Sequence, residues 1–182
     1  TLGLWGFEQI DAVEIAQDVL DAAPHFARDN LDVLNNPVFN FIVDDGRNFL
    51  LTTKNQYDVI TFEPMPMALA GVSTFHTKEY YDLCRRRLAP GGLVTQWIPL
   101  HSLNADMVQS LVYTFKQAFP EYCMWFVNAD LFMVGSDKPL RIDLANAIKR
   151  LQQPNIQAAL IDAGLPDLPE VLTCFFMGKD NV

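Results

Sequence analysis

The feature that most constrains the fold is a regular alternation between short apolar runs and longer amphipathic stretches. It extends from Gln9 to Asp137 and is typical of an α/β layer fold with a mainly parallel sheet. The apolar runs are rich in β-branched and aromatic residues, which predicts strands. They occupy residues 10–15, 38–43, 57–62, 92–97, 122–127 and 131–136, and helical spacing occupies 18–30, 46–53, 77–89 and 105–119.

The last two apolar runs depart from this pattern because only Asn128-Ala129-Asp130 separates them. A parallel crossover needs about a dozen residues or more, so the two runs are expected to form an antiparallel hairpin at one edge of the sheet. After Pro139 the pattern is helical only, over 142–153, 155–164 and 169–178. The sequence therefore predicts a Rossmann-like sheet in residues 1–138 that ends in a hairpin, and a small helical extension of the same domain in residues 139–182.

Composition restricts the classes of ligand. The chain has 182 residues, of which 50% are hydrophobic, a length and composition that fit one globular domain. Its 22 acidic residues outnumber 13 basic ones, giving a net charge of -9. Nucleic acid is therefore not expected as a partner, whereas a cationic small molecule is electrostatically favoured.

The cysteines and the hydropathy indicate the cellular setting. Cys84, Cys123 and Cys174 lie far apart and are interpreted as buried thiols of a reducing compartment. No metal is expected, since no His/Cys/Asp cluster has metal-binding spacing. No apolar run is long enough for a membrane helix and no signal peptide opens the chain, so the visible chain is expected to be cytoplasmic. The missing initiator Met and the start in mid-pattern suggest that residues precede Thr1.

Polar residues close four of the apolar runs. They are Glu14, Asp44-Asp45-Gly46, Glu63 and Gln96. Ligands of open parallel sheets bind beyond the carboxyl ends of the strands, so these side chains are expected to converge on one cleft. Glu14 is placed to accept hydrogen bonds from ribose hydroxyls, with a solvated position before a helix as the alternative.

Either Asp44 or Asp45 is expected to cap the following helix, while the other, Asp45 by preference, faces the ligand. Glu63 is expected to act as a base or to hold a cationic amine or sulfonium, with a helix cap or ion pair as the alternative. The loop over residues 64–75 is long for such a connection and is interpreted as a lid. His76, which follows it, is expected to face solvent at the start of a helix.

Four motifs in this order carry a family resemblance: VEI at 13–15, DDGRNFL at 44–50, YDVITFEP at 57–64, and FHTKEYYDLCRRRLAPGGLVTQW at 75–97. The segment over about residues 9–136 resembles the spermidine synthase-like branch of the S-adenosylmethionine-dependent methyltransferase fold. The resemblance implies that the co-substrate is S-adenosylmethionine or its decarboxylated form, and that no metal is needed. It further implies a ribose contact for Glu14, an adenine contact for Asp44, Asp45 and Gly46, a catalytic role for Glu63, and substrate contacts for Gln96 and Tyr80.

The implied reaction is transfer of an aminopropyl group to a small-molecule amine. Methyl transfer to a small acceptor and a non-catalytic nucleoside-binding module are alternatives. A nicotinamide dehydrogenase is a further alternative, because it would also bind its ligand at the carboxyl ends of the strands. Two departures from the family pattern matter: Pro66 stands where spermidine synthases carry a second Asp, and the glycine-rich loop with its preceding strand, which in this family comes just before residue 1, is not in the sequence. Without that middle strand the sheet edges need a partner, so a homo-oligomer is expected. The Glu-Pro form resembles members fused to membrane domains, which makes an upstream membrane domain an expectation as well.

Overall fold

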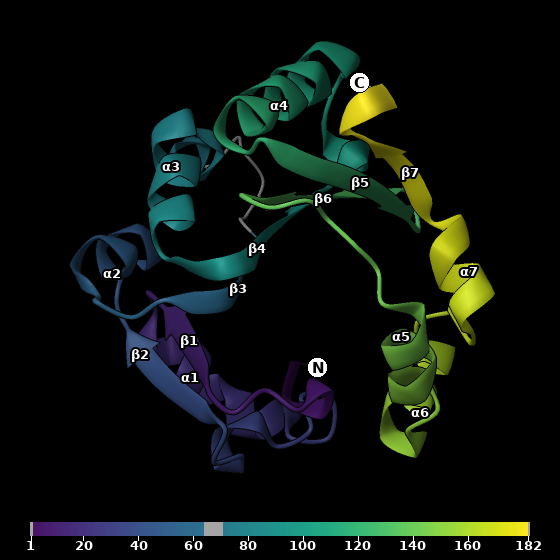
Figure 1. Ribbon diagram of the computed structural model, residues 1–182. Helices are drawn as coiled ribbons and strands as arrows, with labels where there is room; N and C mark the ends of the chain where they lie inside the picture. The colour runs from purple at the N-terminus through teal and green to yellow at the C-terminus, as the bar shows by residue number, and fades with distance from the viewer. Residues whose placement is uncertain (1, 64–70, 182) are drawn as a thin grey trace. The chain divides into compact units, whose positions relative to one another are not determined.

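A computed structural model describes residues 2–63 and 71–181. The chain forms two compact units, each with a sheet of its own (Figure 1). The first unit contains residues 1–53 and 144–168, and the second contains residues 54–143 and 169–182. The predicted single domain with a boundary after residue 138 stays a prediction.

The first unit is built on a parallel pair of strands, β1 (Ile10–Glu14) and β2 (Phe39–Val43), in register from Ile10↔Phe39 to Glu14↔Val43. The helix expected over 18–30 is shorter: α1 (Gln17–Ala22) gives way to the 3-10 helix η2 (Ala23–Phe26). Pro24 has no N–H and cannot continue the α-helical hydrogen bonds, which explains the early end. The other elements of this unit are η1 (Leu2–Trp5), η3 (Val33–Asn35), α2 (Gly46–Thr52), α5 (Leu144–Leu151) and α6 (Pro154–Asp162).

The second unit contains a five-stranded sheet in the order β3-β4-β6-β5-β7. β3 (Tyr57–Phe62) runs parallel to β4 (Leu88–Ile98), and β6 (Asp130–Ser136) runs antiparallel to both β4 and β5 (Glu121–Val127). The predicted β5–β6 hairpin is thus confirmed. Its two turn residues have left-handed backbones, with φ of 49° at Asn128 and 67° at Ala129, as a tight hairpin turn requires.

The end of the chain is not purely helical, so the prediction of a helical pattern over 169–178 is wrong in part. α7 (Leu168–Thr173) is followed by a strand, β7 (Phe175–Gly178), and then by the short η6 (Lys179–Asn181). β7 pairs antiparallel with β5, which therefore is not the edge strand that was expected. Two consecutive aromatic residues at 175–176 favour an extended backbone, which explains the strand.

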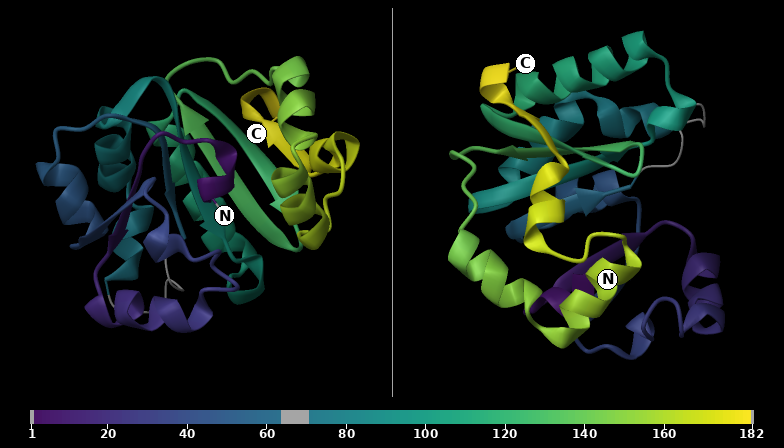
Figure 2. Two further views of the ribbon diagram at one scale, coloured as in Figure 1. Left: turned by 90° about the horizontal axis from the view of Figure 1, so that it is seen from below. Right: turned by 90° about the vertical axis from the view of Figure 1, so that its right-hand side faces the viewer.

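Two helices cover one face of the second sheet, α3 (Lys78–Arg86) and α4 (Ala105–Ala118) (Figure 2). Thr77 and Asn104 cap them by accepting hydrogen bonds from the backbone N–H groups of Tyr80 and Met107. A further short helix, η4 (Val72–His76), precedes α3, and η5 (Leu100–Ser102) precedes α4. The core between helices and sheet is aromatic, and its largest fully buried side chains include Tyr81, Phe115 and Phe119.

The junction between α3 and β4 also differs from expectation. The helix predicted to reach residue 89 ends at Arg86, and β4 already begins at Leu88. Pro90-Gly91-Gly92 therefore lies within the strand, where the pairing of β3 with β4 shifts register. A Cβ on Gly92 would lie 2.8 Å from the carbonyl oxygen of Tyr57, so glycine permits the close approach of the two strands.

The described strands form two separate ladders rather than one continuous sheet. Within residues 2–63 and 71–181, β1 pairs only with β2, and β3 pairs only with β4. β1 and β2 therefore each keep one unpaired edge, and so does β3. The absence of a middle strand, which the family resemblance implies, stays a prediction.

Candidate functional site

Two predicted cofactor residues meet in the first unit, at the carboxyl ends of β1 and β2. Glu14 is the register partner of Val43, and the backbone N–H of Asp44 donates to the carbonyl oxygen of Glu14 at 3.2 Å. Glu14 is half-buried, and its Oε1 accepts a hydrogen bond of 2.9 Å from the backbone N–H of Ala16. The carboxyl end of this strand pair therefore brings the backbones of Glu14 and Asp44 together, and the Glu14 carboxylate also supports the turn into α1.

The two consecutive aspartates have different local roles. Asp45 caps α2, because its Oδ1 accepts from the backbone N–H of Asn48 at 2.8 Å. Asp44 accepts from the N–H of Asp45 at 2.8 Å and from the Asn48 side chain at 2.9 Å. The preference for Asp44 as the cap is therefore wrong, because α2 begins at Gly46 and leaves Asp45 at the cap. Cofactor contacts of Glu14, Asp44, Asp45 and Gly46 stay predictions.

The second unit holds the predicted catalytic residue. Phe62 is the last residue of β3 and the register partner of Gln96 on β4. Glu63 comes next and is exposed. Pro66 and most of the expected lid lie outside the described residues, and the described remainder of that segment includes η4.

An aromatic cluster flanks this strand end. The Tyr80 ring contacts the Phe62 ring edge-on with centroids 5.1 Å apart, and the Phe75 ring at 5.0 Å. Tyr80, which was predicted to bind substrate, is only 3% exposed. Its ring packs against Phe62, which precedes Glu63, and against Phe75, which precedes His76. A contact between Tyr80 and the substrate stays a prediction.

Gln96 belongs to a hydrogen-bonded chain inside the core. It is 0% exposed and lies on the same strand face as Val94 and Ile98. The Tyr81 hydroxyl donates to Gln96 Oε1, and Gln96 Nε2 bonds His76 Nδ1. His76 is 9% exposed, so the expectation that it faces solvent is wrong: the ring turns inward to meet a buried amide.

Burial keeps this chain of side chains uncharged. It lowers the pKa of His76 from 6.5 to about 4, because the imidazolium would lose its hydration. It raises the pKa of Tyr81 well above its ordinary range for the same reason. The neighbouring Cys84 thiol, fully buried, has its pKa raised to about 12 and is therefore not a nucleophile at neutral pH.

Sequence reasoning missed His76 and Tyr81 as members of this chain. A signal existed for its centre, since Gln96 alternates in step with the apolar Val94 and Ile98 and so falls on the core face. A buried amide needs hydrogen-bonding partners, which could have directed attention to polar groups at the start of the helix that covers the strand. Neither partner could be chosen from spacing alone.

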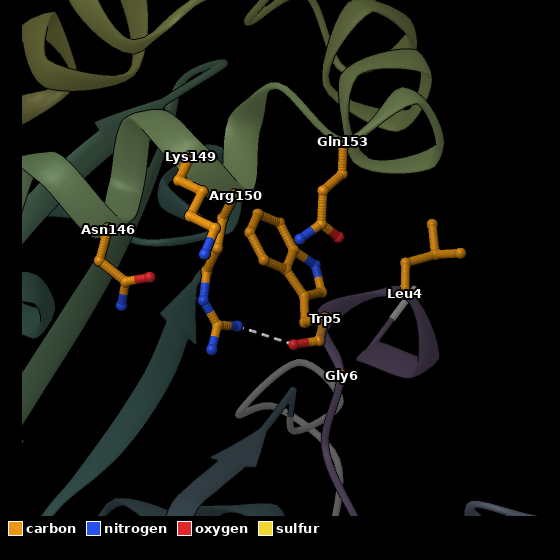
Figure 3. A pocket seen from close by; sticks show the side chains of 7 residues that line it. All are labelled: Leu4, Trp5, Gly6, Asn146, Lys149, Arg150 and Gln153. Carbon is orange, nitrogen blue, oxygen red and sulfur yellow. Dashed lines mark hydrogen bonds between the residues drawn. The ribbon is translucent and has the colours of Figure 1, made fainter.

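A hollow of about 260 Å³ lies in the first unit, and none of the residues predicted to bind ligands lines it (Figure 3). Trp5 of η1 and Lys149 and Arg150 of α5 help to line it, and Arg150 Nη1 donates to the Trp5 carbonyl oxygen at 2.8 Å. Its full lining is Leu4, Trp5, Gly6, Asn146, Lys149, Arg150 and Gln153. No carboxylate lines it, so the predicted ribose contacts are not formed there.

Within residues 2–63 and 71–181, no group of three His, Cys, Asp or Glu side chains is arranged to hold a metal ion. In the same part of the chain, no helix is long and apolar enough to cross a bilayer. All three cysteines are free thiols, Cys84 buried and the others half-buried.

Comparison with known proteins decides the family. The sequence model of the spermine/spermidine synthase domain matches residues 4–129. This chain belongs to the spermine/spermidine synthase family. Within it, the chain is 35% identical over 91 residues to polyamine aminopropyltransferase 1 of Pseudomonas aeruginosa, a match that covers 49% of this chain and 32% of that protein.

Solved structures show the same fold. Spermidine synthase from Thermotoga maritima aligns with a TM-score of 0.70 at 15% identity, over 93% of this chain and 57% of that one. Human methyltransferase-like protein 13, in complex with SAH, aligns with a TM-score of 0.64 at 16% identity, over 84% of this chain and 71% of that one. The predicted α/β methyltransferase-type fold and the predicted family are thus confirmed. The chain spans about a third to a half of the length of the curated relatives it matches.

Proposed function

We propose that this protein is an aminopropyltransferase that uses decarboxylated S-adenosylmethionine and a small-molecule amine. The observation that carries the proposal is the position of Glu63: an exposed carboxylate directly follows β3 in a chain of the spermine/spermidine synthase family. The carboxyl end of a parallel strand is where open α/β sheets bind ligands. A carboxylate there attracts a cationic amine and can accept its proton.

The first unit supplies residues that fit a nucleoside. Glu14 and Asp44 are neighbours at the carboxyl end of the β1–β2 pair, and carboxylate oxygens accept hydrogen bonds from ribose hydroxyls. Glu14 uses Oε1 for the backbone of Ala16, which leaves its second oxygen for a ligand. In this proposal Glu14 holds the ribose while Asp44, Asp45 and Gly46 contact the adenine.

Glu63 would act on the amine. In the transfer step the amine nitrogen forms a bond to the carbon beside the sulfonium, the carbon–sulfur bond breaks, and its electron pair stays on sulfur as a thioether. The nitrogen loses one proton, and Glu63 is the proposed acceptor. The remaining contribution of the protein is to hold the amine in line with the reacting carbon, a positional effect that can be large.

Substitution of Glu63 by Gln tests this proposal in the whole natural protein that carries this sequence. The variant should bind the thioether product as wild type does, while turnover falls about a hundredfold or more. A matched control is Glu79→Gln, which removes an acidic side chain from the first turn of α3. Unchanged turnover in Glu63→Gln would remove this residue from the mechanism.

Product analysis separates the alternatives. Mass spectrometry of the acceptor distinguishes aminopropyl from methyl incorporation, and a methylated product would favour the methyltransferase alternative. Calorimetry with both sulfonium compounds and their thioether products tests the non-catalytic module, which gains support if binding occurs without turnover. A homo-oligomer, a cytoplasmic location and an upstream membrane domain remain predictions for the whole protein.

A further inference from the structure

The hollow between η1 and α5 is a cavity that the proposed transferase function leaves unused (Figure 3). Both elements belong to the first unit, so the walls of the hollow lie within one compact body. Its volume of about 260 Å³ lies just below the range of roughly 300–1,000 Å³ that is typical of pockets for drug-sized ligands. A small ion or a short polar group therefore fits it better than a nucleoside does.

Two cationic side chains of α5 line this hollow, Lys149 and Arg150, both in the last turn of the helix. Figure 3 shows the two side chains leaving the helix in the same direction. Within residues 2–63 and 71–181, neither of them forms an ion pair with a carboxylate. In a chain of net charge -9, the hollow therefore brings together two positive charges that have no acidic partner in that part of the chain.

Arg150 is held in place by a neutral group. Its Nη1 donates to the carbonyl oxygen of Trp5 at 2.8 Å, a bond that joins α5 to the last residue of η1. The carbonyl orients the guanidinium without neutralising its charge, and the other N–H donors stay available for another partner. A basic residue in the last turn interacts favourably with the helix dipole, but that effect does not require the side chain to reach η1. The guanidinium is therefore positioned in advance for an acceptor, which lowers the entropic cost of binding one.

Neutral donors complete the lining. The indole N–H of Trp5 can only donate, and it has no hydrogen-bond partner among the residues that the structure describes. Gln153, at the N-cap of α6, makes no side-chain cap hydrogen bond, and its amide nitrogen carries two further donors. Figure 3 shows the indole nitrogen of Trp5 turned towards this amide. Charged and neutral donors thus line one space that no carboxylate lines.

This lining disfavours the two substrates of the proposed transfer. The amine and the sulfonium compound are both cations, and two uncompensated positive charges repel them. The complementary ligand is an anion with several acceptor oxygens, which Arg binds through its planar fork and Lys binds as a point charge. A phosphate group carries about two negative charges and offers oxygens in several directions, whereas a carboxylate is planar and carries one. The donors of η1 and α5 lie on different sides of the hollow and so match the phosphate.

We propose that the hollow lined by Trp5, Lys149 and Arg150 is a binding site for a phosphate group, either the free ion or a small phosphate ester. The site goes beyond the proposed transferase function, because none of the residues assigned to the co-substrate or the amine lines it. A bound phosphate contacts both η1 and α5, and it adds to the bond between Arg150 and Trp5 in joining them.

Two-dimensional nitrogen–proton NMR of the whole natural protein, labelled on tryptophan, measures this binding directly. The indole N–H signal of Trp5 is identified by its loss in Trp5→Phe. Inorganic phosphate at pH 8, added at constant ionic strength with sodium chloride, should shift this signal to saturation and leave the other tryptophan signals in place. Glycerol 3-phosphate should saturate the same signal if esters are accepted, and saturation by inorganic phosphate alone would identify the free ion as the ligand. Equal affinity for succinate, which carries the same charge on two carboxylates, would overturn the assignment to phosphate.

Substitutions in α5 test the contacts. Lys149→Gln and Arg150→Gln should each weaken phosphate binding by about fivefold or more, the upper size for one exposed charge pair. Arg150→Lys keeps the charge but loses the planar fork, so it should restore only part of the affinity.

The matched control is Lys138→Gln, which removes an exposed lysine of the second unit and makes the same change in net charge. It should bind phosphate as wild type does. No saturable shift of the Trp5 signal, or equal weakening in Lys138→Gln and Lys149→Gln, would overturn the proposal. Because the measurement is binding rather than turnover, its outcome is independent of the transferase proposal.

Discussion

The buried histidine makes a prediction about stability that does not depend on any ligand. His76 titrates near 6.5 in an unfolded chain, but in the folded protein its pKa is lowered to about 4. Below pH 6.5 the unfolded state therefore binds a proton that the folded state excludes. By linkage, the free energy of unfolding falls by about 1.4 kcal/mol per pH unit between these two values.

The sign and the size follow directly. Well above pH 6.5 the ring is neutral in both states and has no effect on the pH dependence. As pH falls below 6.5, the free energy of unfolding decreases. From pH 7 to pH 5 the contribution of His76 should decrease by about 2 kcal/mol. Solvent screening removes little of this, since the ring is 9% exposed.

Urea denaturation at pH 7, 6 and 5 measures the effect by comparing wild type with His76→Phe. Carboxylates elsewhere titrate in both proteins and cancel in the difference, so the wild type should lose about 2 kcal/mol more than the variant over this interval. His101→Phe, which replaces a histidine of η5 whose side chain is 74% exposed, serves as the control for the exchange of a histidine by phenylalanine. Parallel curves for wild type and His76→Phe would refute the conclusion that this ring is buried and neutral.

Two further predictions concern the same region. Tyr81→Phe leaves the buried Oε1 of Gln96 without a donor and should lower the free energy of unfolding by about 1–3 kcal/mol. Adding Gln96→Leu should recover part of that loss. A double-mutant cycle, measured by urea denaturation, detects this non-additivity. Thr77→Ala removes the cap of α3 and should lower the unfolding free energy by about 1 kcal/mol, with the exposed Ser73→Ala as the control. Additive costs in the first case, or equal effects of the two alanine variants in the second, would contradict these assignments.

The spacing of apolar residues predicted most strands and helices of the second unit, because the apolar residues that form this pattern are also the ones buried in its core. The β5–β6 hairpin followed from a three-residue connection, and that connection has no room for another topology. β7 was missed because Phe175–Gly178 is short and apolar, a run that suits a helix or a strand equally well. Its identity is decided by pairing with β5, which is a tertiary contact.

The end of α3 shows a similar limit. Pro90-Gly91-Gly92 has the composition of a turn, which placed the start of the strand after it. In the structure the strand begins earlier, and Gly92 serves a close approach to the backbone of Tyr57. Composition identifies where the backbone is unusual, but the partner that requires it is distant in sequence.

Among the candidate site residues, those fixed by strand ends were easier to predict than those fixed by side-chain partners. The backbone contact between Glu14 and Asp44 follows from two parallel strands that end together. Which of Asp44 and Asp45 caps α2 depends on where the helix begins, to a single residue, and boundaries of this kind are beyond sequence pattern. His76 was misplaced because its environment is set by Gln96, twenty residues away.

Two adjacent tyrosines connect the core of the second unit with its candidate site. On α3, Tyr80 contacts the rings beside Glu63 and His76, while Tyr81 donates to the amide that fixes the imidazole. Thr77, which caps the same helix, sets the start of α3 and follows His76 directly. The orientation of the His76 ring is therefore held by a capped helix and a buried strand. A Tyr81→Phe variant that folds should accordingly change the tautomer of His76, which nitrogen NMR detects, because Gln96 would be free to turn its amide and present Oε1, an acceptor, to Nδ1.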